Sequence, residues 1–233
     1  MQLSIIIPAH NEAAYLGPTL DAARQAAEGL GERYELIVVN DGSTDATAGV
    51  ARRHGAGVVD VAHRQIAATR NAGARAAEGD WLAFVDADTL VRPATLAAAR
   101  QAIGRGFAGG GAGVVFDAPA LLSSRLGAQA WNLTSRLRRW AAGSFLFARR
   151  DAFMASGGFD ERYYAAEELM LSDALSRRGR FAIVGPPVVT SARKERTFSF
   201  ADHFGVLLRV VATRGRALQS REGLDIWYSP QRV

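Results

Sequence analysis

The sequence lacks cysteine, holds a single lysine and contains no long hydrophobic run. Without cysteine, the chain can form neither a disulfide nor a thiolate metal site. No stretch of about 18 apolar residues runs without a charge, so we expect no membrane-spanning helix. The N-terminus also lacks the basic segment and the apolar core of a signal peptide. These absences predict a cytoplasmic protein, and they leave peripheral contact with the inner face of the membrane open.

Although lysine is almost absent, the chain is basic. Lysine and arginine total 28 against 23 acidic residues, a formal net charge of +5, and Lys194 is the one lysine. Such a balance points to an anionic partner: a nucleic acid, a phosphorylated metabolite or a membrane surface. The alternative is a compositional bias of the genome, which the many alanines and glycines also fit. We disfavour nucleic acid, because basic and aromatic residues are not interleaved as in nucleic-acid-binding segments.

Strand and helix patterns alternate in the first half of the chain. Short apolar runs predict strands at Leu3–Pro8, Glu35–Asn40, Gly57–Val61 and Trp81–Asp86. The stretches between them predict helices at Glu12–Gly29, Thr44–His54 and Gln65–Glu78. This alternation predicts an α/β fold with a mostly parallel central sheet flanked by helices. In such sheets ligands bind beyond the carboxyl ends of the strands.

The second half is less regular. We expect further strands, including a small second sheet, at Gly109–Phe116, Phe145–Arg149, Phe181–Val184 and Pro187–Thr190. We expect helices at Leu121–Trp140, at about Ala165–Arg178 and at Phe198–Leu218. The last is basic and would form a C-terminal helical extension. Because the chain has 233 residues and no break in composition, one domain is expected.

Three predicted strands end in acidic or polar clusters that would meet at one edge of the sheet. The clusters lie at Pro8–Glu12, Asn40–Asp45 and Asp86–Asp88. Asp86 and Asp88 are two residues apart, so both carboxylates can be directed to one divalent cation and its phosphates. The alternative is that they only form the turn and helix cap before Pro93.

Asp41 and Glu12 each allow two interpretations. Asp41, beside Gly42, can accept a hydrogen bond from an N–H of a nucleotide base such as uracil, or it can simply make a turn before a helix. Glu12 can bind sugar hydroxyls or cap its own helix. Taken singly, neither residue decides between a ligand site and local structure.

Together, these segments resemble the inverting family 2 glycosyltransferases of the GT-A fold. The matching segments are Ile7–Glu12, Val39–Asp45, Ala68–Gly73, Phe84–Asp88, Gly157–Glu161 and Glu167-Glu168 followed by Leu171. The resemblance covers roughly Leu3 to Arg180 and is specific as an ordered set. A Rossmann dehydrogenase is disfavoured, because no Gly-x-Gly-x-x-Gly follows the first strand.

The resemblance implies that a nucleotide-diphosphate sugar lies across the strand ends. Pro8, Ala9 and Glu12 would line the nucleoside pocket. Asp41 would bind the base, and Arg70 would assist at the base or the phosphate.

The resemblance also implies a divalent cation, Mn²⁺ or Mg²⁺. Asp88 would bind the cation, and Asp86 would hold the ribose or a metal-bound water. The cation would neutralise the leaving diphosphate as a Lewis acid. Asn40 replaces an aspartate that is frequent in the family, while Asp41 keeps the second acid.

An inverting transfer needs a carboxylate that takes the proton of the acceptor hydroxyl. The family usually has a Glu-Asp pair at the start of a helix, with the aspartate as the base, whereas this chain has Glu167-Glu168. We assign the base to Glu168, which is one methylene longer than aspartate, with Glu167 as the second candidate. Gly157-Gly158-Phe159-Asp160 resembles an acceptor-side loop, where glycine allows close backbone approach.

The segment from Ala118 to Arg150 contains six arginines and no acid. Its predicted helix carries leucines at helical spacing, and we expect them to face the core. The alternative is an interfacial helix that contacts anionic lipid. Arg193 and Lys194 either contact the diphosphate or are solvated, and we expect His203 to be a surface or core residue rather than a metal ligand.

These observations predict one glycosyltransferase domain over residues 1–233. Residues 1–117 would bind the nucleotide sugar, residues 118–197 would form the acceptor side, and residues 198–233 the basic helical extension. We expect one sugar to be moved, with inversion, from a UDP-linked donor to an acceptor hydroxyl, since no Gln-x-x-Arg-Trp motif of processive synthases is present. A lipid-linked or anionic acceptor fits the charge. The alternative is a non-catalytic nucleotide- or lipid-binding module on the same scaffold.

Overall fold

The structure is a computed structural model that describes residues 1–117, 122–193, 213 and 216–224. In this part of the chain eight strands form one sheet in the order β3-β2-β1-β4-β7-β6-β8-β5. The strands are β1 (Gln2–Ala9), β2 (Arg33–Asp41), β3 (Gly57–Val61), β4 (Trp81–Val85), β5 (Thr89–Leu90), β6 (Gly109–Phe116), β7 (Phe145–Arg149) and β8 (Phe181–Thr190). The α/β class predicted from the sequence is therefore confirmed.

The sheet is mostly parallel. Strands β3, β2, β1 and β4 run parallel, as do β6 and β8, while β7 lies antiparallel between β4 and β6. The expected small second sheet is wrong for the described residues. Phe181–Val184 and Pro187–Thr190 form a single strand, β8, because its pairing with β6 continues beyond the Gly-Pro-Pro segment after one register shift.

Seven α-helices lie in the described part of the chain. They are α1 (Ala13–Glu28), α2 (Thr47–Arg53), α3 (Ile66–Ala76), α4 (Pro93–Gly104), α5 (Leu122–Arg138), α6 (Arg150–Ser156) and α7 (Glu167–Ser176), with a short 3-10 helix at Arg216–Gln219. The sequence interpretation missed α4 and α6. Helix α4 begins at Pro93, which suits the first helical position because that N–H needs no partner. The predicted helix at Phe198–Leu218 lies almost entirely outside the described residues.

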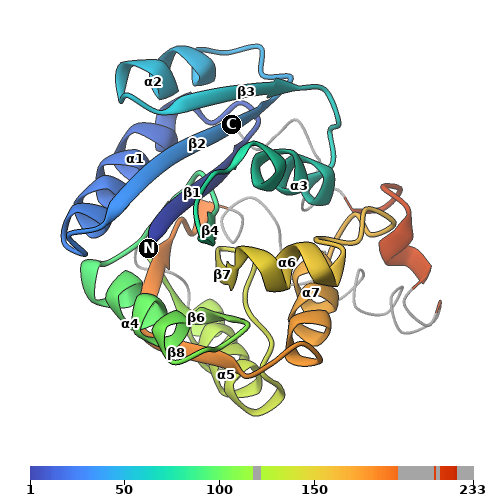
Figure 1. Cartoon of the computed structure of the whole chain (residues 1–233). Coiled ribbons are helices and arrows are strands. Elements are labelled where there is room, and N and C mark those ends of the chain that lie inside the picture. Colours follow the sequence, from blue (N-terminus) through green and yellow to red (C-terminus); the bar gives the residue numbers. More distant parts are fainter. Residues whose placement is uncertain (118–121, 194–212, 214–215, 225–233) are drawn as a thin grey trace.

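Helices cover both faces of the sheet (Figure 1). Apolar side chains of α1, α2 and α4 pack against one face, and those of α3, α6 and α7 against the other. Side chains alternate between the faces of a strand, so Ile5 and Ile7 of β1 join the first core and Ile6 joins the second. The Phe84 ring packs against those of Phe153 and Phe159, with centroid distances of 5.2 and 5.0 Å. This packing fixes α6 and the loop after it against the sheet.

Helix α5 contacts the sheet through a polar side chain. Strand β7 pairs with β6 only at Gly109–Gly111. Further along β6, the Asn132 amide accepts from Val114 N at 2.8 Å and donates to Val114 O at 2.9 Å. Leu126, Leu133 and Leu137 of α5 therefore lie on the opposite side, exposed to solvent. The expectation that they face the core is wrong, because Asn132 and the partly buried Trp131 turn toward the sheet instead.

Among the described residues, no helix combines the length and the apolar composition that crossing a bilayer requires.

Candidate active site

Acidic and basic side chains from distant parts of the chain meet at one edge of the sheet. The parallel strands β1, β2 and β4 end there. Strand β8 runs parallel to β6 and ends at the same edge, whereas the antiparallel β7 begins there. As a result, Glu12, Asp41 and Asp88 lie at the same edge as Gly143 and Ser144, which precede β7, and Arg193, which follows β8. This is the edge at which the sequence predicted a ligand site.

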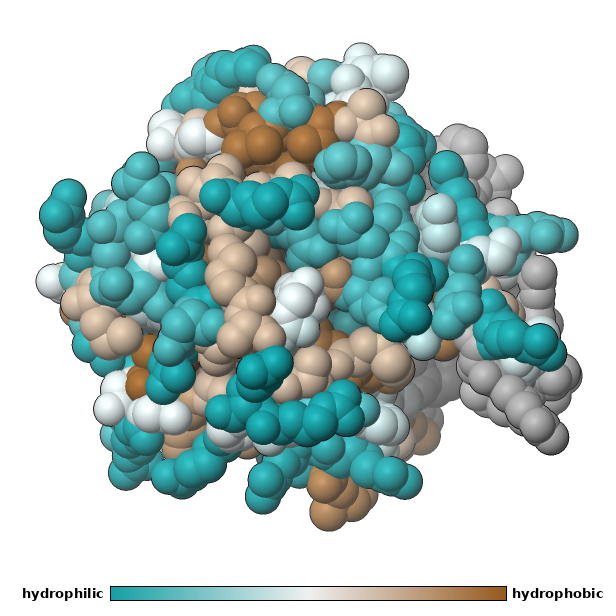
Figure 2. Space-filling view, turned by 45° about the vertical axis from the view of Figure 1, so that its right-hand side comes forward, coloured by the Kyte–Doolittle hydropathy of each residue, from teal (hydrophilic) through white to brown (hydrophobic). Residues whose placement is uncertain are grey.

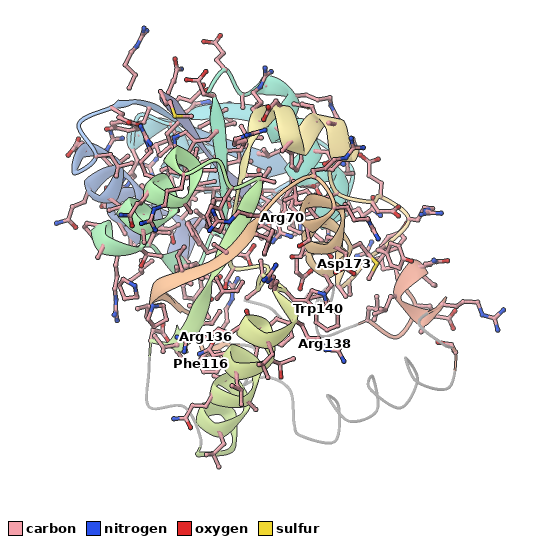
Figure 3. All side chains as sticks on the ribbon, turned by 60° about the horizontal axis from the view of Figure 1, so that its bottom comes forward. Arg70, Phe116, Arg136, Arg138, Trp140 and Asp173 are labelled. Atoms are coloured by element: carbon pink, nitrogen blue, oxygen red, sulfur yellow. The ribbon has the colours of Figure 1, made fainter. Side chains whose placement is uncertain are left out.

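Arg70 lies at the centre of this edge. It belongs to α3, is 2% exposed, and its guanidinium points toward the sheet (Figure 3). It donates to Asp86 Oδ1 at 2.7 Å, to Glu167 Oε1 at 2.6 Å and to the carbonyl of Gly143 at 2.8 Å. Burial alone would lower the pKa of Arg70, but the carboxylates of Asp86 and Glu167 outweigh it and the pKa is raised. Arg70 therefore stays charged and joins α3, β4 and α7.

Glu168 lies beside this ion-pair cluster in the first turn of α7. A Cβ added to Gly143 would lie 3.4 Å from Arg70 Nη2 and 3.6 Å from Glu168 Cδ, so the two side chains share one space. Burial, and then the carboxylate of Glu167, raise the pKa of Glu168 to about 8. A carboxyl group with such a pKa can exchange a proton near neutral pH. Burial also raises the pKa of Glu167. The two candidates for the base differ in their contacts: Glu167 is ion-paired with Arg70 at 2.6 Å, whereas Glu168 lies beside this pair.

Arg193 neutralises two other acidic residues of the edge. It follows β8 and donates to the Glu12 carboxylate at 2.7 and 2.5 Å, and its Nη2 lies 3.0 Å from Asp88 Oδ2. The short strand β5 pairs with β8, and Ser191 N donates to Asp88 O at 3.1 Å, which brings the two segments together. Glu12, Asp88 and Tyr15, whose ring lies 4.6 Å from the guanidinium carbon, surround the arginine. Of the two sequence interpretations of Arg193, a solvated surface residue is wrong.

Asp41 anchors the start of α3. Its carboxylate accepts from Arg64 N at 2.8 Å, from Gln65 N at 3.3 Å and from Thr69 Oγ1 at 2.7 Å. A carboxylate offers about four acceptor positions, so these bonds leave room for one further donor. Asp41 therefore has a structural role at the end of β2, and base binding remains a prediction.

The glycines of the predicted acceptor-side loop allow it to pack against α3. Gly158 has φ 74°, and a Cβ there would lie 2.7 Å from Asn71 Oδ1. Asn71 accepts from Phe159 N at 2.9 Å and donates to Phe159 O at 2.8 Å. Gly157-Gly158-Phe159 thus holds the segment that precedes α7 and its two glutamates.

The remaining predicted residues lie at the same edge. Pro8 and Ala9 are buried at the end of β1. Within the described ranges no group of three or more His, Asp and Glu side chains is arranged to hold a metal ion. Asp86 and Asp88 nevertheless suit Mg²⁺ or Mn²⁺, which commonly take one or two carboxylates and complete their shell with phosphates and water. His203 lies outside the described residues.

Two features of this edge had no clear signal in the sequence. The carbonyl of Gly143 binds Arg70, and the neighbouring Ser144 carries a buried hydroxyl with no hydrogen-bond partner among the described residues. The Gly143-Ser144 pair at the start of a predicted strand was the available hint, because polar residues at strand starts also reach the edge when a strand runs antiparallel.

The sequence of this chain matches a known protein family. The sequence profile described as Glycosyl transferase family 2 matches residues 4–155. Validoxylamine A glucosyltransferase of Streptomyces hygroscopicus subsp. jinggangensis is 38% identical over 98 residues, 39% of this chain and 23% of its own length. Dodecaprenyl-phosphate galacturonate synthase of Rhizobium johnstonii is 35% identical over 96 residues, 38% of this chain and 28% of its own length. The matches to these two relatives thus span about a quarter of their length.

Solved structures show the same fold. A mannosyltransferase from Pyrobaculum calidifontis, in complex with GDP-Man and Mn²⁺, aligns with TM-score 0.66 and 22% identity over 89% of this chain and 64% of that one. Staphylococcus aureus TarS 1-349 with UDP-GlcNAc aligns with TM-score 0.65 and 18% identity over 99% of this chain and 73% of that one. The profile match covers well over half of the sequence, and the chain belongs to glycosyl transferase family 2.

Proposed function

We propose that this protein transfers one sugar, with inversion, from a UDP-linked donor to an acceptor hydroxyl, with the help of a divalent cation. The observation that carries the proposal is the pairing of Arg70 with Asp86 and Glu167, directly beside Glu168. It puts a proton acceptor next to the carboxylates that would face the diphosphate. Three similar proteins support it: a relative named as a glucosyltransferase, a mannosyltransferase in complex with GDP-Man and Mn²⁺, and TarS in complex with UDP-GlcNAc.

The donor would lie across the ends of β1, β2 and β4. Pro8 and Ala9 would line the nucleoside pocket, and the remaining acceptor position of Asp41 would take an N–H of the base. Glu12 would bond hydroxyls of the donor once Arg193 has moved to the diphosphate. The guanidinium group of Arg193 suits this change of partner from carboxylate to diphosphate, because it forms the same paired hydrogen bonds with both kinds of anion.

Asp88, with Asp86, would hold Mn²⁺ or Mg²⁺ against the diphosphate. When bound, the cation would stabilise the negative charge of the leaving diphosphate. Arg193 now neutralises Asp88, so cation binding requires that this ion pair opens. The buried hydroxyl of Ser144, close to Asp86 through the bond from Asp86 N to Ser144 O at 3.3 Å, is a candidate donor to the sugar or the diphosphate.

Glu168 would act as the base. Its carboxylate takes the proton of the acceptor hydroxyl while the acceptor oxygen forms a bond to the anomeric carbon of the sugar. The bond from that carbon to the diphosphate breaks on the opposite face, and the nucleoside diphosphate leaves with the electron pair. Arg70 holds Glu167 and Asp86 in ion pairs, so we assign the proton transfer to Glu168, the neighbouring carboxyl group.

The test is to measure release of nucleoside diphosphate from a set of nucleotide sugars, and binding of the same donors, in wild type and in Glu168→Gln. We expect Glu168→Gln to bind the donor as wild type does and to lose transfer by about 100-fold or more, the usual contribution of a general base. Glu78→Gln, an exposed glutamate, is the matched control and should keep both properties.

Two results would count against the proposal. Turnover of Glu168→Gln at the wild-type rate would remove Glu168 from the reaction. A wild-type protein that binds nucleotide sugars but never releases the diphosphate, with or without acceptor, would be a binding module on this scaffold.

A further inference from the structure

Helix α5 exposes a row of leucines that the core does not use. Leu126, Leu133 and Leu137 are 56%, 62% and 75% exposed. At about 100° per residue, the three side chains fall within about 40° of one another around the helix axis. Isolated exposed leucines need no explanation, but a row along one helix marks an interaction face. We call this row the α5 leucine face.

Cationic side chains flank the α5 leucine face. On the same helical projection, Arg136 lies about 80° to one side of the row and Arg138 about 120° to the other. Both arginines are exposed, and so is Arg139 just beyond the helix. Long arginine side chains can keep their charge at a polar boundary while their apolar stems lie beside buried leucines.

Acidic side chains are missing from this part of the chain. Residues 118–150 contain six arginines and neither aspartate nor glutamate. In Figure 1 α5 lies at the lower end of the molecule, and in Figure 2, turned about the vertical axis, hydrophobic atoms project at that end among hydrophilic ones. A leucine row bordered by arginines, in a segment without acidic residues, suits a lipid bilayer, whose interior is apolar and whose surface carries negative phosphate groups.

We propose that α5 docks on an anionic lipid bilayer, with the α5 leucine face in the acyl region and its arginines at the phosphate groups. The helix fits the description of an interfacial helix, with an apolar face, a cationic flank and no capacity to span the membrane. Attraction between juxtamembrane arginines and anionic lipid adds to the apolar burial. A protein partner would more commonly combine apolar residues with charges of both signs, and this segment offers only one.

The C-terminal end of α5 leads directly to the candidate active site. Trp140 Nε1 donates to Asp173 Oδ1 at 2.9 Å, and the Arg138 guanidinium carbon lies 5.5 Å from the Trp140 ring (Figure 3). Ala141 N donates to Ser172 Oγ at 3.0 Å, and Ser172 Oγ donates to Glu168 O at 2.7 Å. Docking of α5 would therefore bring α7 and Glu168 close to the lipid surface. An acceptor carried by a lipid would then be within reach of Glu168. This last step rests on the proposed function, whereas the docking of α5 does not.

The test is flotation of the purified protein with vesicles of phosphatidylcholine alone or mixed with phosphatidylglycerol. We expect the wild type to float with the anionic vesicles and to be released by high salt. Leu133→Ser/Leu137→Ser and Arg136→Gln/Arg138→Gln should each bind about tenfold more weakly or worse. All four side chains are exposed, so unchanged melting temperatures should show that the variants fold.

Two matched controls should bind like wild type. Met154→Ser removes an exposed hydrophobic side chain from α6, and Arg52→Gln/Arg53→Gln removes two exposed arginines from α2. The proposal is overturned if wild type does not float, or if the α5 variants float as well as the controls. It is also overturned if Leu133→Ser/Leu137→Ser turns a dimer into a monomer without affecting flotation, since a second copy would then cover the face. Because no sugar transfer is measured, failure here is distinguishable from failure of the proposed function.

Discussion

Arg70 is shared by two carboxylates, and a third lies next to them. Glu167 and Asp86 each accept a short hydrogen bond from it, while Glu168 is close to the same buried charge without being its main partner. Three acids around one cation cannot all ionise without cost in a buried setting. The pKa values of both glutamates reflect this cost: burial raises that of Glu167, and burial together with Glu167 raises that of Glu168 to about 8. On our assignment of Glu168 as the base, a glutamate with a raised pKa would stand where the resemblance implies an aspartate.

This raised pKa predicts a pH-dependent loss of stability. The folded-state pKa lies above the unfolded value, so the folded protein binds the proton more tightly, and stability falls as pH rises from about 4.5 to about 8. We expect Glu168→Gln, which mimics the protonated acid, to match wild type near pH 5. Near pH 9 it should exceed wild type by on the order of 2 kcal/mol in the free energy of unfolding.

Urea unfolding of both proteins at several pH values measures this difference. Glu78→Gln, at an exposed position, should show no pH-dependent gain. A constant difference between Glu168→Gln and wild type across the pH range would show that Glu168 is ionised normally.

At the scale of elements, α3 shows how closely a helix approaches this sheet. Asp41 holds its first turn, Asn71 holds the loop before α7, and Gly73 lies directly on the strands. A Cβ at Gly73 would lie 2.4 Å from Ile6 Cγ2 and 2.7 Å from Val39 Cγ2. The sequence offered Ala68–Gly73 as a family motif, and the structure adds the reason for its last residue, which is close packing.

We therefore expect Gly73→Ala to lower the free energy of unfolding by about 1–3 kcal/mol, because the core must be overpacked. Gly127→Ala is the control, for which we expect a change in stability of the opposite sign. It lies within α5 with open space around it, so alanine should raise stability by about 0.5–1 kcal/mol through helix propensity. Thermal or urea unfolding measures both changes. Equal effects at the two positions would contradict the close approach of α3 to β1 and β2.

The elements that the sequence predicted best are those whose pattern is local. Strands β3, β6 and β7 have the predicted bounds, since each is a short apolar run between turn residues. Helix α4 was not among the predicted helices, although the alternative for Asp86 and Asp88 included a helix cap before Pro93. Helix α6 was missed because it follows β7 with no intervening loop residue to mark its start.

At the scale of the whole molecule, the sequence could predict which edge of the sheet holds the polar residues but not how they pair. Convergence of Glu12, Asp41 and Asp86 follows from parallel strands, which the alternating pattern reveals. The contact between Arg193 and Asp88 depends on β5 pairing with β8 across about 100 residues, and no local pattern encodes that pairing. The orientation of α5 likewise depends on Asn132 meeting Val114, so periodicity alone pointed its leucines the wrong way.

The arginine excess also has a more specific meaning at this scale. Arg70 and Arg193 neutralise acidic residues inside the candidate active site, and Arg136 and Arg138 border an exposed apolar face. These four arginines have different surroundings and, on our account, bind different anions: carboxylates or a diphosphate in the site, and lipid phosphates outside it. A single explanation of the +5 charge is therefore not needed.

The most direct test of the account is the melting temperature of wild type and Asp88→Ala with UDP, with Mn²⁺ and with both. Ligand at 100 times its Kd stabilises by about 2.7 kcal/mol, and a chain of this size gains about 2–4 °C per kcal/mol. We predict a rise of several degrees for wild type with UDP and Mn²⁺ together, larger than with UDP alone. Asp88→Ala should lose the metal-dependent part, and Asp151→Ala, a more exposed aspartate, should keep it. An undiminished metal-dependent rise in Asp88→Ala would contradict the account.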